Sequence, residues 1–217
     1  MWEGGLFPSF YFYLISRTMS FLTTKLQAVN VMIGYLGEAP VNSISDNVGL
    51  PLSVSQAKTI LDETSKGIQV DGWFFNIEKD VTFSPDVETN FIDLSGDILS
   101  ADSVDGHKDN VVVRGSRLYD LTDNTYEFTK PVKMDIIRFL EWDYLPEAAR
   151  RYINLKASRI LVARSLGAPE IEQLILRDEV FAKARLESLD SGTSDRTIFD
   201  SYDTAIRIGV NRPQNIL

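Results

Sequence analysis

The acidic turns around His107 contain the residue types best suited to bind a metal ion. Asp97, Asp102, Asp105 and Asp109 could supply hard oxygen ligands near His107, the one histidine of the chain. Their spacing matches no EF-hand loop, and acidic turns are ordinary hairpin connectors. A Ser-His-Asp triad would also need His107, but no Gly-x-Ser-x-Gly segment accompanies it. We expect His107 to be a solvated turn residue, and we predict no metal ligand and no catalytic residue in the chain.

Glu141 and Asp143, on either side of Trp142, form a second candidate site. Glycoside hydrolysis needs two carboxylates at a suitable separation, so these residue types permit a glycan or peptidoglycan hydrolase. The chain has 31 acidic residues, however, so chance pairs are frequent. No glycine-rich phosphate loop follows a strand and opens a helix, which disfavours a nucleotide enzyme. A glycan or peptidoglycan hydrolase that uses Glu141 and Asp143 stays open as an alternative function.

Composition excludes several other kinds of site. The 217 residues carry a formal net charge of −9, and this disfavours tight, non-specific binding to nucleic acid. The chain has no cysteine, so it has no disulfide framework, thiolate metal site or cysteine nucleophile. The apolar run at residues 6–15 is too short to span a bilayer, and we predict no membrane partner.

The elements that would position these residues are organised around a helix expected over residues 142–167. Pro146 suits its beginning, while Gly167 and Pro169 suit its end. The helix has five basic residues and has apolar residues on two sides, which predicts a helix of its own bundle on one side and a different subunit or domain on the other. We expect the bases to pair with acids of the following helix rather than to line a DNA channel. The predicted subunit-interface residues are Leu155, Val162, Leu166, Arg150, Arg151 and Arg159.

Three further helices and seven strands are expected. The helices are predicted at 20–37, where Ser20 is the cap, at 53–72, where Ser53 and Gln56 form a capping box, and at 168–190. From residue 73 the hydrophobic period changes from 3.6 to 2, which is typical of half-buried strands. The strands are predicted at 73–83, 91–94, 98–104, 111–114, 117–121, 125–128 and 132–139.

These elements predict an α+β fold, an antiparallel four-helix bundle with an inserted small antiparallel β-domain and an extended C-terminal tail. Residues 19–72 and 141–190 would form the bundle, and residues 73–140 the β-domain. Residues 1–18 would be an N-terminal extension that need not be ordered, or a short docking arm. Residues 191–217 would be a docking tail, because isolated apolar residues among polar ones suit a segment that orders on a partner. Its predicted contact residues are Phe199, Tyr202, Ile206 and Ile208.

Five segments in order give the sequence a family resemblance. They read TTKLQAVNVMIGYLGEAPVNS (23–43), GWFFN (72–76), SPD (84–86), RGSRLYD (114–120) and LPEAARRYI (145–153). Together they resemble the tail tubular protein A family of short-tailed, podovirus-type bacteriophages, over about residues 19–190. Phe74 stands where the family often has tryptophan, and the C-terminal region matches least clearly.

The resemblance implies a structural virion protein rather than an enzyme. It implies a ring of twelve subunits that joins the portal protein to the tail nozzle, tubular protein B, and through which double-stranded DNA passes during ejection. It implies no cofactor, assembly in the host cytoplasm, and a place in the tail or neck of the virion. A plain oligomeric binding module unconnected with phage is a further alternative.

Overall fold

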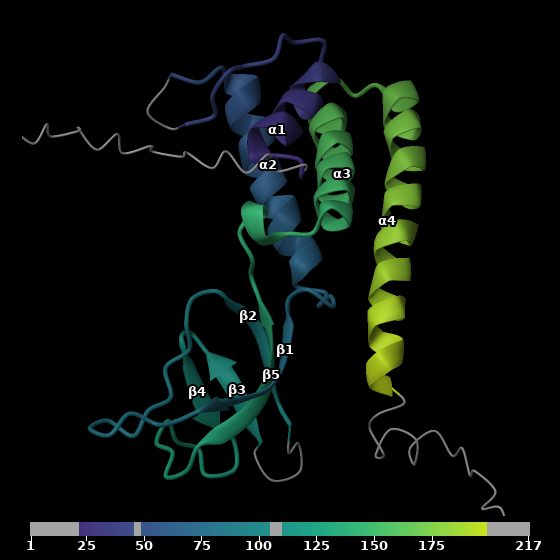
Figure 1. The fold of residues 1–217 in the computed structure, drawn as a ribbon. Helices are drawn as coiled ribbons and strands as arrows, with labels where there is room; N and C mark the ends of the chain where they lie inside the picture. Colours follow the sequence, from purple (N-terminus) through teal and green to yellow (C-terminus); the bar gives the residue numbers. More distant parts are fainter. Residues whose placement is uncertain (1–21, 46–48, 105–109, 199–217) are drawn as a thin grey trace, which may run out of the picture.

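The structure is a computed structural model that describes residues 22–45, 49–104 and 110–198. Within them lie the helices α1 (Lys25–Gly34), α2 (Leu52–Gln69), α3 (Glu147–Ser165) and α4 (Pro169–Ile198), with a 3-10 turn, η1 (Trp142–Tyr144), before α3. The strands are β1 (Ile77–Phe83), β2 (Ile98–Ser103), β3 (Val111–Arg114), β4 (Arg117–Asp120) and β5 (Val132–Arg138). Figure 1 shows α1, α2 and α3 at one end of the molecule and the strands at the other, while α4 begins beside α3 and extends past it to the level of the strands.

The first two helices begin at other residues than the sequence analysis proposed. Thr24 caps α1, because its Oγ1 accepts from the backbone N–H of Gln27 at 3.2 Å while Gln27 Oε1 accepts from the N–H of Thr24 at 2.9 Å. The expected cap, Ser20, lies outside the described residues. In α2 the capping box was wrong, since the helix already begins at Leu52 and Ser53 donates to Glu38 instead.

The prediction of an antiparallel four-helix bundle was wrong. The described residues form a mixed α+β fold with four helices and two small antiparallel sheets. Helix α1 has 10 residues and is about 15 Å long, so it cannot follow the full length of α2 and α3, which have 18 and 19 residues. The longest helix, α4, packs extensively on α3 alone, whereas α1, α2 and α3 all contact one another. The helices therefore form a three-helix group with α4 laid against its outer side.

The break expected after residue 190 is also absent, because α4 continues through the Ser-Gly-Thr-Ser-Asp segment to Ile198. Ser191 Oγ donates to the carbonyl of Glu187 at 2.9 Å, a bond that serine makes within a continuing helix. Turn-forming residue types are a weak prior that helical context overrides here. The expected tail residues Phe199, Tyr202, Ile206 and Ile208 lie outside the described residues, as do residues 1–18.

The strands form two small sheets. Strand β5 is central to the first, in the order β1-β5-β2, and β3 pairs with β4 in the second; all pairs are antiparallel. The segments expected as strands at 91–94 and 125–128 make only isolated bridges. Residues 73–76 form a turn, so β1 begins at Ile77, and a bulge at Asp80, where φ is +56°, interrupts its alternation.

Two hydrophobic clusters support these parts. The first gathers apolar side chains of all four helices with Trp73 and Trp142, and the second lies among the strands. The second cluster consists of Ile92, Leu94, Leu118, Phe128, Val132, Met134 and Ile136. The helical part and the β part therefore each have apolar interiors, and the chain crosses between them at residues 70–76 and 139–141.

Candidate assembly surfaces

Arg150 is the centre of a polar network between α3 and the segment that leads into α1. Its guanidinium is only 3% exposed, and it donates to the backbone carbonyls of Leu145, Thr23 and Asp143, each at 2.8 Å. A planar guanidinium suits three separate acceptors of this kind. Arg150 was predicted to lie at a subunit interface, but the structure places its guanidinium inside its own chain.

Glu147 and Trp142 complete the network around Thr23. The Glu147 carboxylate accepts from the backbone N–H of Thr23 at 2.8 Å and from its hydroxyl at 2.6 Å. The indole of Trp142 donates to the Thr23 carbonyl at 2.9 Å. The residue before the α1 cap is therefore held by three side chains from η1 and the first turn of α3, more than a hundred positions along the chain.

The other predicted interface residues are divided between the interior and the surface. Leu155 and Val162 are buried in the helical cluster, so their side chains are already covered within one chain. Leu166 is 48% exposed, and Arg151 is exposed as well. Helical periodicity correctly separated a second apolar stripe from the first, but it could not show that α4 of the same chain covers most of it.

Arg159 forms the main ion pair between α3 and α4. Its Nε and Nη2 donate to the two carboxylate oxygens of Glu179 at 2.6 and 3.3 Å, and Glu179 is buried. The bond to Glu179 raises the pKa of the Arg159 guanidinium above its ordinary value. The expected pairing of this basic helix with acids of the next one is confirmed for Arg159. Arg164 lies instead 3.9 Å from Glu63 of α2.

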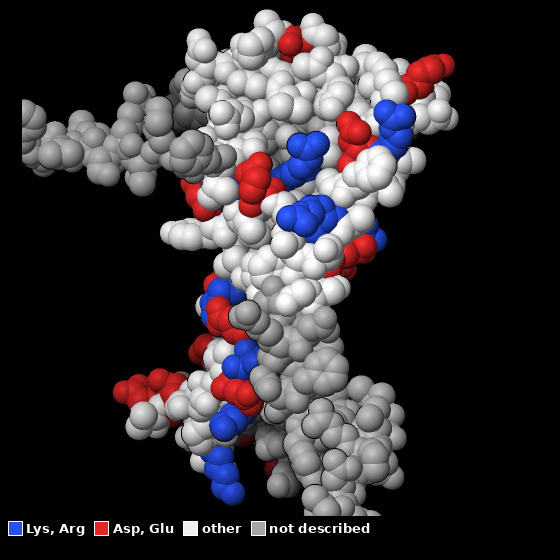
Figure 2. All heavy atoms as spheres, turned by 45° about the vertical axis from the view of Figure 1, so that its right-hand side comes forward, with Lys and Arg blue, Asp and Glu red and all other residues white. Residues whose placement is uncertain are grey.

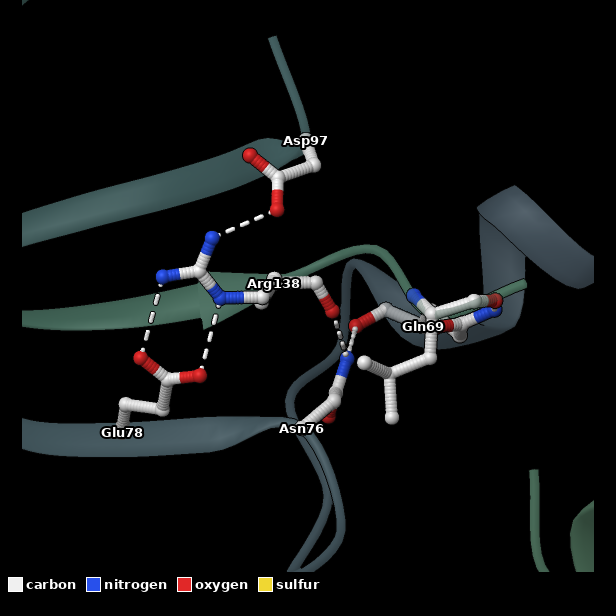
Figure 3. Close-up of polar contacts among 6 residues, drawn as sticks. Gln69, Asn76, Glu78, Asp97 and Arg138 are labelled. Carbon is white, nitrogen blue, oxygen red and sulfur yellow. Dashed lines mark hydrogen bonds and ion pairs between the residues drawn. The ribbon is translucent and has the colours of Figure 1, made fainter. Parts of the chain in front are cut away.

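Gln69 and Asn76 join the helical part to the β part. The Gln69 amide accepts from the N–H of Leu140 at 2.7 Å and donates to its carbonyl at 3.0 Å, so it pairs with Leu140 as a strand would. Asn76 Nδ2 donates to the carbonyls of Gln69 and Arg138 at 2.9 and 3.0 Å (Figure 3). Both amides are buried. The two crossing segments are therefore tied to each other at the point where they leave the helices.

Arg138 of β5, beside this junction, links Glu78 of β1 with Asp97, the residue directly before β2. Figure 3 shows its guanidinium between Glu78, which it binds at 2.8 and 3.1 Å, and Asp97. The bond from Arg138 lowers the pKa of Glu78, while a bond from Ser95 and then that from Arg138 lower the pKa of Asp97. Both carboxylates are partly exposed, so the network orients the strands more than it stabilises them.

Gly72 lies in the segment that crosses from α2 to β1, and its backbone conformation favours glycine. Its φ is +74°, and a Cβ at this position would lie 2.9 Å from Cδ1 of Ile137 in β5. Gly115, between β3 and β4, has a φ of +67° but open space around the same position. Close packing between the crossing and β5 therefore depends on the absence of a side chain at Gly72.

The outer side of α4 exposes large apolar side chains. Leu174, Leu176, Val180 and Phe181 are 44 to 69% exposed, while Ile175, Ala182 and Leu186 are buried against the rest of the helical part. Figure 2 brings this side of the molecule forward, and the helical end shows wide areas without charge. The sequence analysis followed only the buried stripe. The sequence did contain a signal for these exposed residues. They are apolar, and at 100° per residue they lie outside the buried stripe of the helix.

An open groove lies between α2 and α3, away from α4. Its volume is about 470 Å³, and its lining combines buried Ile60 and Leu161 with exposed polar groups. Glu63 and Arg164 stand at its rim, and both side chains are about two-thirds exposed. The lining residues are Ser55, Gln56, Thr59, Ile60, Glu63, Leu161, Arg164 and Ser165.

Those candidate catalytic and metal residues that the structure describes are not gathered into a site. Glu141 and Asp143 lie on the surface at η1, where the Asp143 carbonyl accepts from Arg150. Asp97 binds Arg138, whereas Asp105, His107 and Asp109 lie outside the described residues. Among the residues that the structure describes, no three His, Asp or Glu side chains are placed to hold a metal ion. None of the described helices is long and apolar enough to cross a membrane.

In the part of the chain that the structure describes, the fold presents apolar faces and ion-pair networks between its elements, which are features of a protein that acts through packing contacts. Comparison with known proteins identifies the family to which the chain belongs. Residues 26–196 match the tail tubular protein family, and the chain belongs to that family. Tail tubular protein A of Klebsiella phage KP34 is 32% identical over 144 residues, which are 66% of this chain and 74% of that protein. The chain is therefore a structural component of a bacteriophage tail and not an enzyme, which removes the hydrolase alternative.

Proposed function

We propose that this tail protein is the adaptor between the portal and the tail nozzle, a tubular protein B, and that twelve copies form a ring around the DNA channel in the neck of the virion. The observation that carries the proposal is the exposed apolar face of α4 in a chain of the tail tubular protein family. Four large apolar side chains within eight residues are more than an isolated helix surface normally leaves in water. A neighbouring protein that covers them would recover their hydrophobic free energy.

The charge of the chain supports a channel role. A net charge of −9 provides few clustered cations for phosphate groups, and each such contact would slow a passing duplex. We propose that double-stranded DNA passes without specific contacts and that the protein needs no cofactor. Assembly would take place in the host cytoplasm before the genome is ejected.

The contact residues are proposed in two groups. Leu166 and Arg151 of α3 are exposed and stay proposed contacts with a neighbouring subunit. Leu155, Val162, Arg150 and Arg159 would instead hold the helices in the arrangement that the ring requires, since their side chains are engaged within the chain. Phe199, Tyr202, Ile206 and Ile208 are proposed to dock on the portal.

Electron microscopy of the purified protein tests the proposal. The protein would be imaged in negative stain alone, with the portal of the same phage, and with portal and nozzle together. We expect a ring seated on the portal, and we expect removal of residues 199–217 to prevent seating while the rest of the chain stays folded. A full-length chain that stays folded but binds neither portal nor nozzle would contradict the adaptor role.

A further inference from the structure

We infer that α4 of one subunit inserts Leu174 and Phe181 into the groove between α2 and α3 of a second copy of the chain. This inference rests on the proposed function, because it names the surfaces by which neighbouring subunits would meet. Leu174 and Phe181 are seven residues apart and lie on one side of α4, where they are 62% and 69% exposed. These two side chains are the most exposed of the four large apolar residues on the outer side of α4.

The groove has the size and the floor that such side chains need. A cavity of about 150 Å³ accommodates benzene, and the groove, at about 470 Å³, is larger. Ile60, which is 6% exposed, is the apolar side chain that reaches its floor, and Leu161 lies fully buried beneath, while Ser55 and Thr59 provide a polar margin. A central apolar anchor within a polar margin is the usual arrangement of a protein interface.

Each of the two surfaces carries one acid and one base beside its apolar side chains. At 100° per residue, Arg177 and Asp178 lie on either side of the stripe made by Leu174 and Phe181, and both are exposed. The groove presents one acid and one base at its rim, Glu63 and Arg164, whose nitrogen and oxygen are 3.9 Å apart. This is a long, solvated pair, so a second subunit can exchange partners with it at little cost.

The two surfaces also lie on different sides of the subunit. Arg159 of α3 faces α4, to which it is bound through Glu179. Leu161 and Arg164, which line the groove, are turned at least about 120° from Arg159 around the axis of α3. A contact between two different surfaces is heterologous, and repeated heterologous contacts close into a ring when the rotation permits. Pairing of α4 with α4 would instead stop at a dimer.

Cysteine cross-linking tests the contact without background, because the natural chain contains no cysteine. Phe181→Cys and Thr59→Cys are prepared as separate full-length variants and mixed before oxidation, so that any bond between the two positions joins two subunits. We expect the mixture to form the disulfide-linked dimer roughly ten-fold faster than Phe181→Cys mixed with Val87→Cys, since a specific contact concentrates the two thiols. Val87 is the control because it is 95% exposed and far along the chain from the groove.

The outcomes separate this inference from the adaptor role. Equal rates for the two mixtures, or faster cross-linking of Phe181→Cys with itself, would overturn the insertion of α4 into the groove. Wild-type rings observed by electron microscopy together with equal rates would leave the adaptor role standing and place the subunit contact elsewhere. As a second measurement, Phe181→Asp should abolish rings while Gln173→Asp, which adds the same charge at an exposed position of α4, should retain them. Rings formed by Phe181→Asp would also overturn the inference.

Discussion

Replacement of Arg150 distinguishes an internal role from a subunit contact. Arg150→Met keeps most of the side-chain volume but removes three charge-assisted hydrogen bonds to backbone carbonyls. Such bonds contribute about 1.5 to 3 kcal/mol each. The loss is partly compensated, because Trp142 still donates to the Thr23 carbonyl and Asp143 lies at the surface, where water can replace the guanidinium. We therefore expect the free energy of unfolding to fall by about 3 kcal/mol.

Urea unfolding of the isolated protein measures this change, and Arg151→Met is the matched control. Arg151 is the next residue of α3 and is exposed, so its replacement should change the free energy of unfolding by less than about 0.5 kcal/mol. With an m-value of about 2 to 3 kcal/mol per molar, the urea midpoint of Arg150→Met should lie about 1 M below that of the control. Midpoints that coincide, combined with loss of ring formation by Arg150→Met alone, would refute the internal role and restore Arg150 to a subunit interface.

Four further changes test the fold that carries the assembly surfaces. Gln69→Leu should lower the free energy of unfolding by about 2 kcal/mol in urea titrations, since it leaves an N–H and a carbonyl of the junction without their partner. Gly72→Ala should lower the melting temperature slightly more than Gly115→Ala in calorimetry, because both require left-handed backbone and the first must also displace the end of the Ile137 side chain. In the folded wild type, Arg138 lowers the pKa of Glu78, and Ser95 and Arg138 lower the pKa of Asp97, so the stabilisation from these carboxylates is present at neutral pH and is lost as acid protonates them. Arg138→Met removes the contribution of the guanidinium, so the variant should lose less stability than the wild type below about pH 4. Val162→Asp should abolish the cooperative thermal transition in circular dichroism, because it places a carboxylate in the helical core; a folded variant defective only in assembly would instead support the subunit contact first expected for this position.

Much of the secondary structure could be predicted from local patterns. Helix α3 ends at Ser165, where Arg164, Gly167 and Pro169 predicted an end, and Gly167 has a φ of +56°. Strand β3 has the predicted bounds, because a short apolar run between turns leaves little freedom. The bulge in β1 was missed, since its positive φ falls on Asp80 in a sequence that otherwise alternates.

The arrangement of the helices could not be predicted in the same way. Periodicity gives the direction of each side chain around its own helix axis, but it does not say which neighbour covers that direction. Leu155 and Val162 were therefore assigned to a second subunit although α4 is available within the chain. The exposed side of α4 is a different case, because the same periodicity could have revealed it: Phe181 is apolar but lies outside the buried stripe of that helix. The network of Arg150 joins residues more than a hundred positions apart, and no local pattern contains that information.

The bond from Asn76 to the Arg138 carbonyl brings the two ends of the β part within 3.0 Å of each other. A segment whose ends nearly touch can be exchanged for another of different length without displacing the chain on either side of it. Related tail proteins could thus alter their β part, or replace it by a short loop, while the same helical scaffold continues to meet its neighbours. The tail would then diversify by exchange of the β part, while the helical part and the geometry of the assembled particle stay the same.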